Sequence, residues 1–153
     1  FLDGGCPPRA PGAGDLPLAV CDANIAAQNA VTAAWSLGIG SCFIGDVMER
    51  CEDHRRLLGL PPYVFPAAMV VFGHPTAQQR ARPKLERQAM EHVVHENGYR
   101  RMDGAELRRA LAPQAGTRPY GDWLAAFCAR KYNSDFSREM TRSVEAYLSA
   151  FLP

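Results

Sequence analysis

The chain has 153 residues and a mass of 16.8 kDa, a size that suits one globular domain burying roughly 68–70% of its unfolded surface. Hydrophobic residues make up 47% of the sequence and charged residues 22%, a composition typical of ordinary soluble proteins that argues against wholesale disorder. The formal net charge is only +1, so we do not expect a dedicated nucleic-acid-binding protein.

Neither a membrane segment nor a secretory leader is expected. The longest uncharged apolar run, Val64–Phe72, holds nine residues including one proline, whereas a spanning helix needs about 20. The N-terminus lacks the basic region and apolar stretch of a signal peptide. The five cysteines are an odd number without a C-x-x-C pair, which predicts free, mostly buried thiols and a cytoplasmic location.

The first elements are a loop and a helix. Residues 1–21 are rich in glycine and proline, and we expect a loop there. An alanine-rich helix follows over Asp22–Leu37, with Asp22 as its N-cap and Gly38 as a left-handed stop. Because small side chains cover most of this helix, other backbones could approach it closely, and we expect it at the centre of the fold.

The middle of the chain predicts a short extended piece, a helix and a strand. The extended piece falls within Ile39–Ile44, and the helix covers Val47–Leu58 before Gly59. Tyr63–Gly73 is rich in valine and phenylalanine and apolar on both faces, as in a strand that is covered on both sides. Pro66 indicates a start or bulge within this strand.

The C-terminal part predicts helices over 86–97, 103–112 and 120–131 and a final helix from Ser134 or Asp135 onward. Asp103 and Glu106 have the spacing of a capping box. The final helix carries apolar residues at near-helical spacing, namely Phe136, Met140, Val144, Leu148 and Phe151.

Two segments have the composition of a ligand site. Gly38, Gly40 and Gly45 lack a Cβ, so a planar ligand or another backbone could come close; a tight turn in a packed core is the alternative. Residues 80–87 carry net charge +3 and could hold a phosphate, unless they form a solvated basic loop. The basic side chains are Arg80, Arg82, Lys84 and Arg87.

Metal chemistry and hydrolysis have little support. Cys51 with His54, and His92 with His95, are pairs at a spacing that could share a metal, but nothing completes either set to the three or four ligands of a zinc site. We find no G-x-S-x-G motif, no Walker loop and no nucleophile with its base.

Several segments, taken together in their order, resemble the FMN-dependent nitroreductase family. They read IAAQNAVTAAWSLGIGSCFIG at 25–45, LLGLPP at 57–62, VVFGHP at 70–75 and VVHENGYR at 93–100. The resemblance covers residues 20 to 101, and KYNSDFSREMTRSV at 131–144 is similar to the C-terminal helix of some members.

The resemblance implies an α+β fold in which helices flank a mixed sheet. It divides the chain into a loop at 1–21, a nitroreductase-like domain at 22–101 and a helical C-terminal extension at 102–153. It also implies an intertwined homodimer with FMN at the subunit interface and with a contribution from helix 22–37. The family's N-terminal flavin-contacting arginine segment has no counterpart here, so we expect the chain to be a C-terminal portion of such a protein.

The resemblance also implies the site and the reaction. Phe43, Ile44, Gly45 and Asp46 would lie against the flavin ring, with a backbone N–H near Gly45 reaching flavin N5. Arg82 and Lys84, with Arg87 as an addition, would hold the FMN phosphate. NAD(P)H would reduce FMN, which would then reduce a nitroaromatic, a quinone or a similar acceptor. The alternative is a truncated, non-catalytic module for dimerisation or flavin sequestration.

Overall fold

The structure is a computed structural model that describes residues 4–84 and 87–152. It divides into two compact units, one made of residues 1–80 and 135–153 and the other of residues 81–134. The C-terminal helix therefore belongs to the same unit as the N-terminal helix. The predicted boundaries of the nitroreductase-like domain, between residues 21 and 22 and between residues 101 and 102, stay a prediction.

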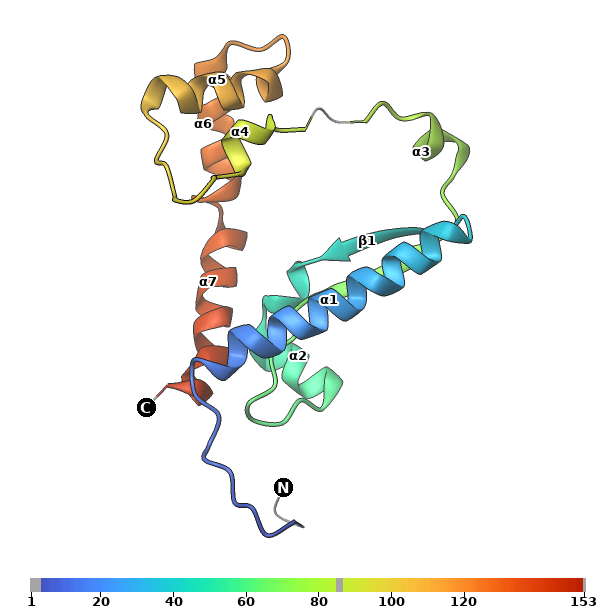
Figure 1. Cartoon of the computed structure of the whole chain (residues 1–153), viewed down its shortest axis with the longest axis vertical. Helices are drawn as coiled ribbons and strands as arrows, with labels where there is room; N and C mark the ends of the chain where they lie inside the picture. Colours follow the sequence, from blue (N-terminus) through green and yellow to red (C-terminus); the bar gives the residue numbers. More distant parts are fainter. Residues whose placement is uncertain (1–3, 85–86, 153) are drawn as a thin grey trace. The chain divides into compact units, whose positions relative to one another are not determined.

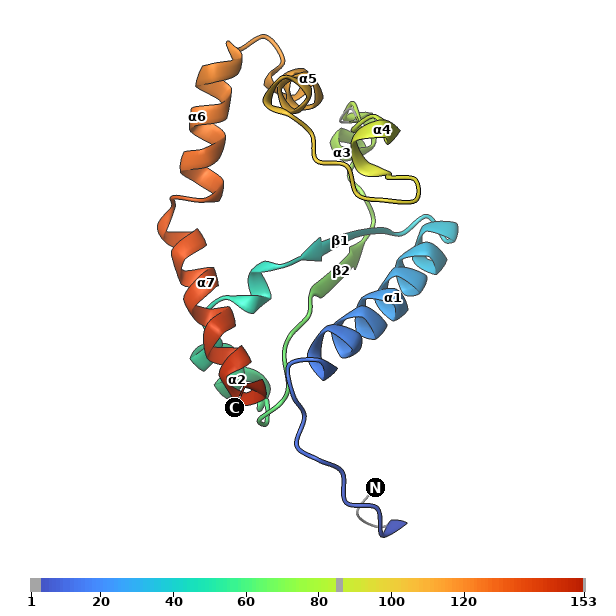
Figure 2. The same cartoon turned by 60° about the vertical axis from the view of Figure 1, so that its left-hand side comes forward.

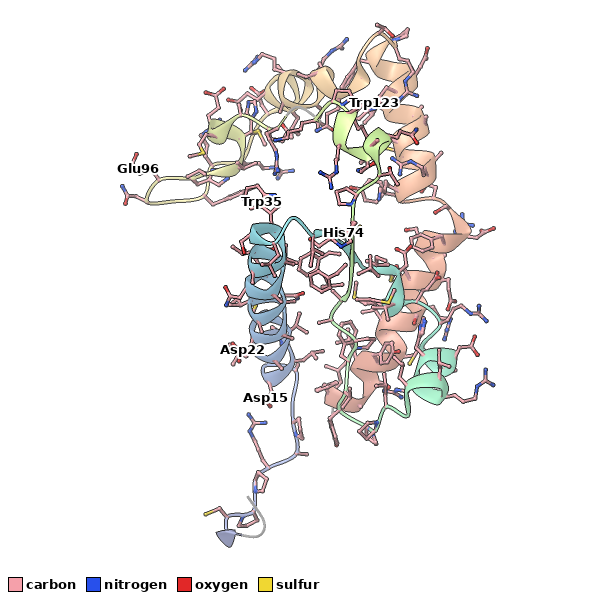
Figure 3. All side chains as sticks on the ribbon, turned by 90° about the vertical axis from the view of Figure 1, so that its right-hand side faces the viewer. Asp15, Asp22, Trp35, His74, Glu96 and Trp123 are labelled. Carbon is pink, nitrogen blue, oxygen red and sulfur yellow. The ribbon has the colours of Figure 1, made fainter. Side chains whose placement is uncertain are left out.

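Helix α1, Asp15–Ser36, begins before Asp22, so the prediction of Asp22 as N-cap and of a loop up to that point is wrong (Figure 3). Pro17 lies in the first turn of α1, where backbone N–H groups have no intrahelical partner and a proline costs no hydrogen bond. Asp15 accepts the Gly12 N–H at 2.8 Å and pairs with Arg9 at 2.6 Å. Gly38, with φ +73°, takes the left-handed conformation expected of the helix stop.

The sheet consists of β1, Gly40–Ile44, paired antiparallel with β2, Met69–Gly73, with Gly40 opposite Gly73 and Ile44 opposite Met69. Helix α1 lies alongside β1 (Figures 1 and 2). The predicted strand over 63–73 is thus too long at its start, because residues 63–68 form no strand. Within the described residues the expected mixed sheet is represented by this antiparallel pair.

The apolar side chains of α1 and the sheet are less covered than the sequence predicts. Leu16 is the buried residue of α1, while Leu18, Ile25 and Trp35 are 61–79% exposed. The strand predicted to be covered on both faces leaves Val71 and Phe72 exposed. In the structure of this chain, α1 is therefore an element with one uncovered side rather than a central helix.

The predicted helix over 47–58 is divided into two pieces. A short 3-10 turn η2, Asp46–Met48, is followed by α2, Cys51–Leu58. Between them Arg50 has φ 52°, the left-handed conformation, which breaks the helical run. Gly59, with φ 61°, ends α2 as predicted.

Helix α7, Asp135–Leu148, packs against α2 and η2 and continues into η3, Ser149–Phe151. The Tyr147 side chain is fully buried, with its ring edge-on to Phe65 at 5.3 Å and its hydroxyl 3.5 Å from the Cys51 carbonyl. Phe151 packs edge-on to Tyr63 at 5.5 Å. The predicted apolar stripe is only partly right, since Phe136 is exposed while Ser143 and Tyr147 are buried.

The second unit is helical, with α4 at Met90–Val93, α5 at Gly104–Ala115 and α6 at Tyr120–Lys131. The capping box is confirmed: Asp103 accepts the Glu106 N–H, and Glu106 accepts the Asp103 N–H. The start of α6 and its end agree with the prediction. Helix α4 is shorter than the predicted 86–97, whose first residue lies outside the described part of the chain.

A short helix, α3 at Ala77–Ala81, follows β2 at the boundary of the two units. Among residues 4–84 and 87–152, no helix is long and apolar enough to cross a membrane. All five cysteines lie in this part and are free, but only Cys51 is buried, so the prediction of mostly buried thiols is wrong. Helices with one small antiparallel sheet give the α+β class that the sequence predicts.

Candidate functional site

The segment expected to lie against a planar ring, Phe43 to Asp46, connects the end of β1 to η2. Phe43 and Ile44 are the last residues of the strand and lie opposite Val70 and Met69. Phe43 is 41% exposed and Ile44 is half-buried. The four residues therefore lie where β1 ends and η2 begins, within the first unit.

Gly45 precedes the 3-10 turn with φ −81° and ψ −17°, a conformation open to any residue. Its carbonyl accepts the Met48 N–H at 3.0 Å. Because the C=O and N–H of a trans peptide point in opposite directions, this bond aims the Asp46 N–H away from the turn. A Cβ added at Gly45 would meet only the Met48 side chain, at 3.5 Å, so this peptide has room for a ligand.

The other glycines of the motif have different uses. A Cβ on Gly40 would lie 3.3 Å from the Gly73 carbonyl oxygen, so this glycine permits close approach of the neighbouring strand. Gly38 serves the helix stop. Another backbone thus approaches Gly40, whereas Gly45 stays open.

The basic segment follows β2 beyond His74 (Figure 3). Arg80, at the end of α3, belongs to the first unit and donates from Nε to the Pro75 carbonyl at 3.2 Å. Arg82 and Lys84 belong to the second unit and are exposed. Neither makes an ion pair with a carboxylate of the described residues, so both cations are available to an anion.

Arg87 is also exposed, but it lines a cavity of the second unit that does not include Arg82 or Lys84. The sequence prediction placed all three on one phosphate. Glu86, counted there in the net charge of 80–87, lies outside the described residues. Sequence reasoning also missed the other basic residues of this cavity, Arg109 and Arg130, although Trp123, Phe127 and Arg130 have the i, i+4, i+7 spacing of one helix face.

The electrostatics of the first unit are dominated by ion pairs away from the ring segment. The carboxylate of Asp15 has its pKa lowered to about 2 by the hydrogen bond from Arg9 and then by the Gly12 N–H. Hydrogen bonds from Arg142 lower the pKa of Glu52 to about 2. No group of three or more metal-ligating side chains is gathered anywhere in the described ranges 4–84 and 87–152.

Comparison with known proteins assigns one segment of the chain to a family. Residues 6–74, which include β1, η2 and β2, match the family model described as Nitroreductase family. This segment of the chain belongs to the nitroreductase family. The resemblance found in the ordered sequence motifs is thus confirmed.

Two curated relatives extend the similarity beyond this nitroreductase segment. A Cr(VI) reductase of Pseudomonas sp. (strain G-1) is 38% identical over 135 residues, which is 88% of this chain and 49% of that protein. An FMN reductase [NAD(P)H] of Bacillus subtilis is 32% identical over 126 residues, or 82% of this chain and 46% of that protein. The chain therefore spans about half the length of the curated relatives it matches.

A solved structure from Bacteroides fragilis NCTC 9343 aligns with 99% of this chain and 65% of its own, with a TM-score of 0.81 and 20% identity. At this identity the likeness establishes the fold alone. The structure of the NfrA1 nitroreductase from B. subtilis also aligns, with 85% of this chain and 58% of its own, a TM-score of 0.61 and 24% identity, so the nitroreductase-like α+β fold that the sequence predicts is confirmed.

Each of two groups of residues, taken by itself, has the chemistry that one part of a phosphorylated flavin requires. An uncrowded peptide at Gly45, followed by an N–H directed away from its own turn, suits a ring edge that accepts a hydrogen bond. Arg82 and Lys84 supply cations without a described carboxylate partner, as a phosphate requires. These two groups of residues lie in separate units.

Proposed function

We propose that the protein is an FMN-dependent oxidoreductase of the nitroreductase type that takes electrons from NAD(P)H. The observation that carries this proposal is the family match over residues 6–74, which contains the open turn at Gly45. The similarity to an FMN reductase [NAD(P)H] supports the cofactor and the reductant. We further propose nitroaromatics, quinones or similar small molecules as acceptors.

In this proposal the chain's own residues bind and orient the cofactor. Phe43 and Ile44 provide apolar contact for one face of the ring, and the backbone N–H of Gly45 or Asp46 donates to its N5 edge. Arg82 and Lys84 hold the phosphate. FMN supplies the hydride chemistry when bound, so no side chain of this chain is assigned as an acid or base.

We also propose that the protein functions as a homodimer. Helix α1 leaves Leu18, Ile25 and Trp35 largely exposed, although large apolar side chains stabilise a protein when they are removed from water. The uncovered side of α1 is the surface that we assign to a second copy. This assignment agrees with the contribution of helix 22–37 to the interface that the family resemblance implies.

A flavin titration tests the function. The purified protein, mixed with FMN and freed of excess, should retain a flavin absorbance and should oxidise NAD(P)H when a quinone is added. Retained flavin without NAD(P)H oxidation would favour the non-catalytic, flavin-sequestering alternative. A protein that retains no flavin and oxidises no NAD(P)H would overturn the proposal.

The phosphate site has a test of its own in Arg82→Ala combined with Lys84→Ala. Charge-assisted hydrogen bonds contribute about 1.5–3 kcal/mol each, so FMN affinity should fall at least about tenfold. Riboflavin, which lacks the phosphate, should bind the variant and the wild type alike. Arg101→Ala with Arg118→Ala, two exposed arginines of the same unit, is the matched control. Unchanged FMN affinity in the first variant would place the phosphate elsewhere.

A further inference from the structure

A cavity of about 780 Å³ lies within the second unit, lined by residues of α4, α5 and α6 and of the segment before α4. This volume is in the range of sites that hold small organic ligands. The residues assigned to the flavin ring lie in the other unit, and neither Arg82 nor Lys84 lines the cavity. The cavity is therefore a feature that the proposed flavin site does not use.

Three arginines give the cavity its charge. Arg87, Arg109 and Arg130 line it, and none of them forms an ion pair with a carboxylate of residues 4–84 or 87–152. Guanidinium groups offer forked donors that match phosphate oxygens. A single carboxylate would neutralise only one of the three cations, whereas a phosphate monoester carries close to two negative charges. The charge thus favours a phosphorylated ligand.

Two stacked rings form an aromatic part of the cavity lining. Trp123, labelled in Figure 3, and Phe127 both line the cavity, with ring centroids 5.3 Å apart and planes inclined by 25°. The guanidinium of Arg130 lies over the Phe127 ring at 5.9 Å. Cation and rings are therefore adjacent on α6, an arrangement that suits a ligand with a planar base close to its anionic group.

His92 adds a polar group that lacks a partner. Its Nδ1 atom is buried and has no hydrogen-bond partner among the described residues, while Nε2 lies 3.6 Å from a carboxylate oxygen of Glu91. A buried polar atom without a partner costs about 1–3 kcal/mol. His92 lines the cavity, and a sugar hydroxyl, which can either donate or accept a hydrogen bond, matches an imidazole ring in either tautomer.

From these groups we propose that the cavity of the second unit binds a nucleoside monophosphate, with the phosphate on the arginines, the base against Trp123 and Phe127, and the sugar beside His92. The proposal does not depend on the flavin function. AMP is the probe for the test, because it carries the base, the sugar and the phosphate in one molecule.

Trp123 itself can report binding. The chain has two tryptophans, and Trp35 lies in the other unit, on the helix that we assign to the dimer interface. Trp35→Phe keeps an apolar ring at that position and leaves Trp123 as the sole tryptophan. AMP should quench the fluorescence of Trp35→Phe protein saturably. Adenosine and inorganic phosphate, each lacking part of the recognised structure, should bind at least about tenfold more weakly. The titration needs no flavin, so it stands even if flavin binding fails.

Arg109→Ala combined with Arg130→Ala, in the Trp35→Phe background, should weaken AMP binding at least about tenfold while adenosine binding stays within about twofold. Arg101→Ala with Arg118→Ala, outside the cavity lining, should leave AMP binding unchanged. Circular dichroism checks the fold, and Arg109→Lys with Arg130→Lys, which keeps the charge, should restore part of the affinity. The proposal is overturned by an unsaturable AMP signal, by equal losses in both alanine pairs, or by competition between AMP and FMN.

Discussion

The Ser143 hydroxyl connects α7 with the two short elements that follow the candidate ring segment. It is fully buried, accepts the Cys51 N–H at 2.8 Å and donates to the Met48 carbonyl at 2.7 Å. Met48 in turn donates its N–H to the Gly45 carbonyl. One serine on the C-terminal helix therefore supports the turn that carries Gly45, although they lie far apart in the sequence.

Replacing this hydroxyl should be costly. Ser143→Ala leaves the buried Cys51 N–H without its partner, which costs about 1–3 kcal/mol, and also removes the bond to the half-buried Met48 carbonyl, so the free energy of unfolding in urea should fall by at least about 1 kcal/mol. Ser149→Ala, whose hydroxyl is exposed and bonds within its own helix, should change it by about 0.5 kcal/mol or less. Equal effects of the two substitutions would show that the buried bonds do not stabilise the fold.

At the scale of elements, α2 and α7 are joined by charge on their exposed side. Arg142 donates two hydrogen bonds of 2.9 Å to Glu52 and also pairs with Glu139 on its own helix. These bonds lower the pKa of Glu52 from 4.5 to about 2 and also lower the pKa of Glu139. The contribution of the Glu52 carboxylate to the free energy of unfolding is therefore complete above pH 4.5 and is lost as the pH falls toward 2.

Arg142→Met should remove the pH dependence of stability that the Glu52–Arg142 pair causes. The urea midpoint of the wild type should fall more steeply than that of the variant between pH 4.5 and pH 2, and the variant should be the less stable of the two at pH 7. Arg138→Met, which loses an exposed pair with Asp135 inside α7, is the control and should follow the wild type. Parallel pH profiles for the wild type and Arg142→Met would contradict the prediction.

The predictions of helices and strands are correct where the cause lies in neighbouring residues and wrong where it lies in a distant segment. The box at Asp103 and Glu106 and the glycine stops at Gly38 and Gly59 depend on neighbouring residues, and the structure contains them. The break at Arg50 was not predicted, because the bond from its N–H to Glu139 comes from a distant helix. The strand over 63–73 was predicted too long because its first residues contact α7 and η3 through Phe65 and Tyr63 instead of a strand.

At the scale of the whole molecule, the exposed side of α1 tests the proposed homodimer. Ile25→Asp places a carboxylate where we expect apolar contact with a second copy, and burying an unpaired charge costs several kcal/mol. The dimer dissociation constant should therefore rise at least about tenfold, measured by light scattering over a concentration series. Thr117→Asp, an exposed polar position of the second unit, should leave it unchanged. A wild type that is monomeric at all concentrations would contradict the dimer itself.

The positions of the candidate site residues likewise depend partly on neighbouring residues and partly on distant contacts. Residues 43–46 are neighbours in the chain, so the sequence alone could place them together where a short extended segment ends. Grouping Arg87 with Arg82 and Lys84 relied on the same closeness in sequence. Arg87 lines a cavity with Arg109 and Arg130, whose positions depend on how α5 and α6 pack, and its place beside Arg82 and Lys84 on one phosphate stays a prediction.

The sequence by itself determined the resemblance to the nitroreductase family, the fold class and the ends of the helices that have caps or glycine stops, because these depend on short-range spacing and on motifs in a fixed order. Only the tertiary structure decided that α7 joins the first unit, that Ser143 and Tyr147 are buried there, and that three arginines separated in the chain share one cavity. These features depend on contacts between distant segments, which are set by how side chains fill space around one another rather than by any periodic pattern within one segment.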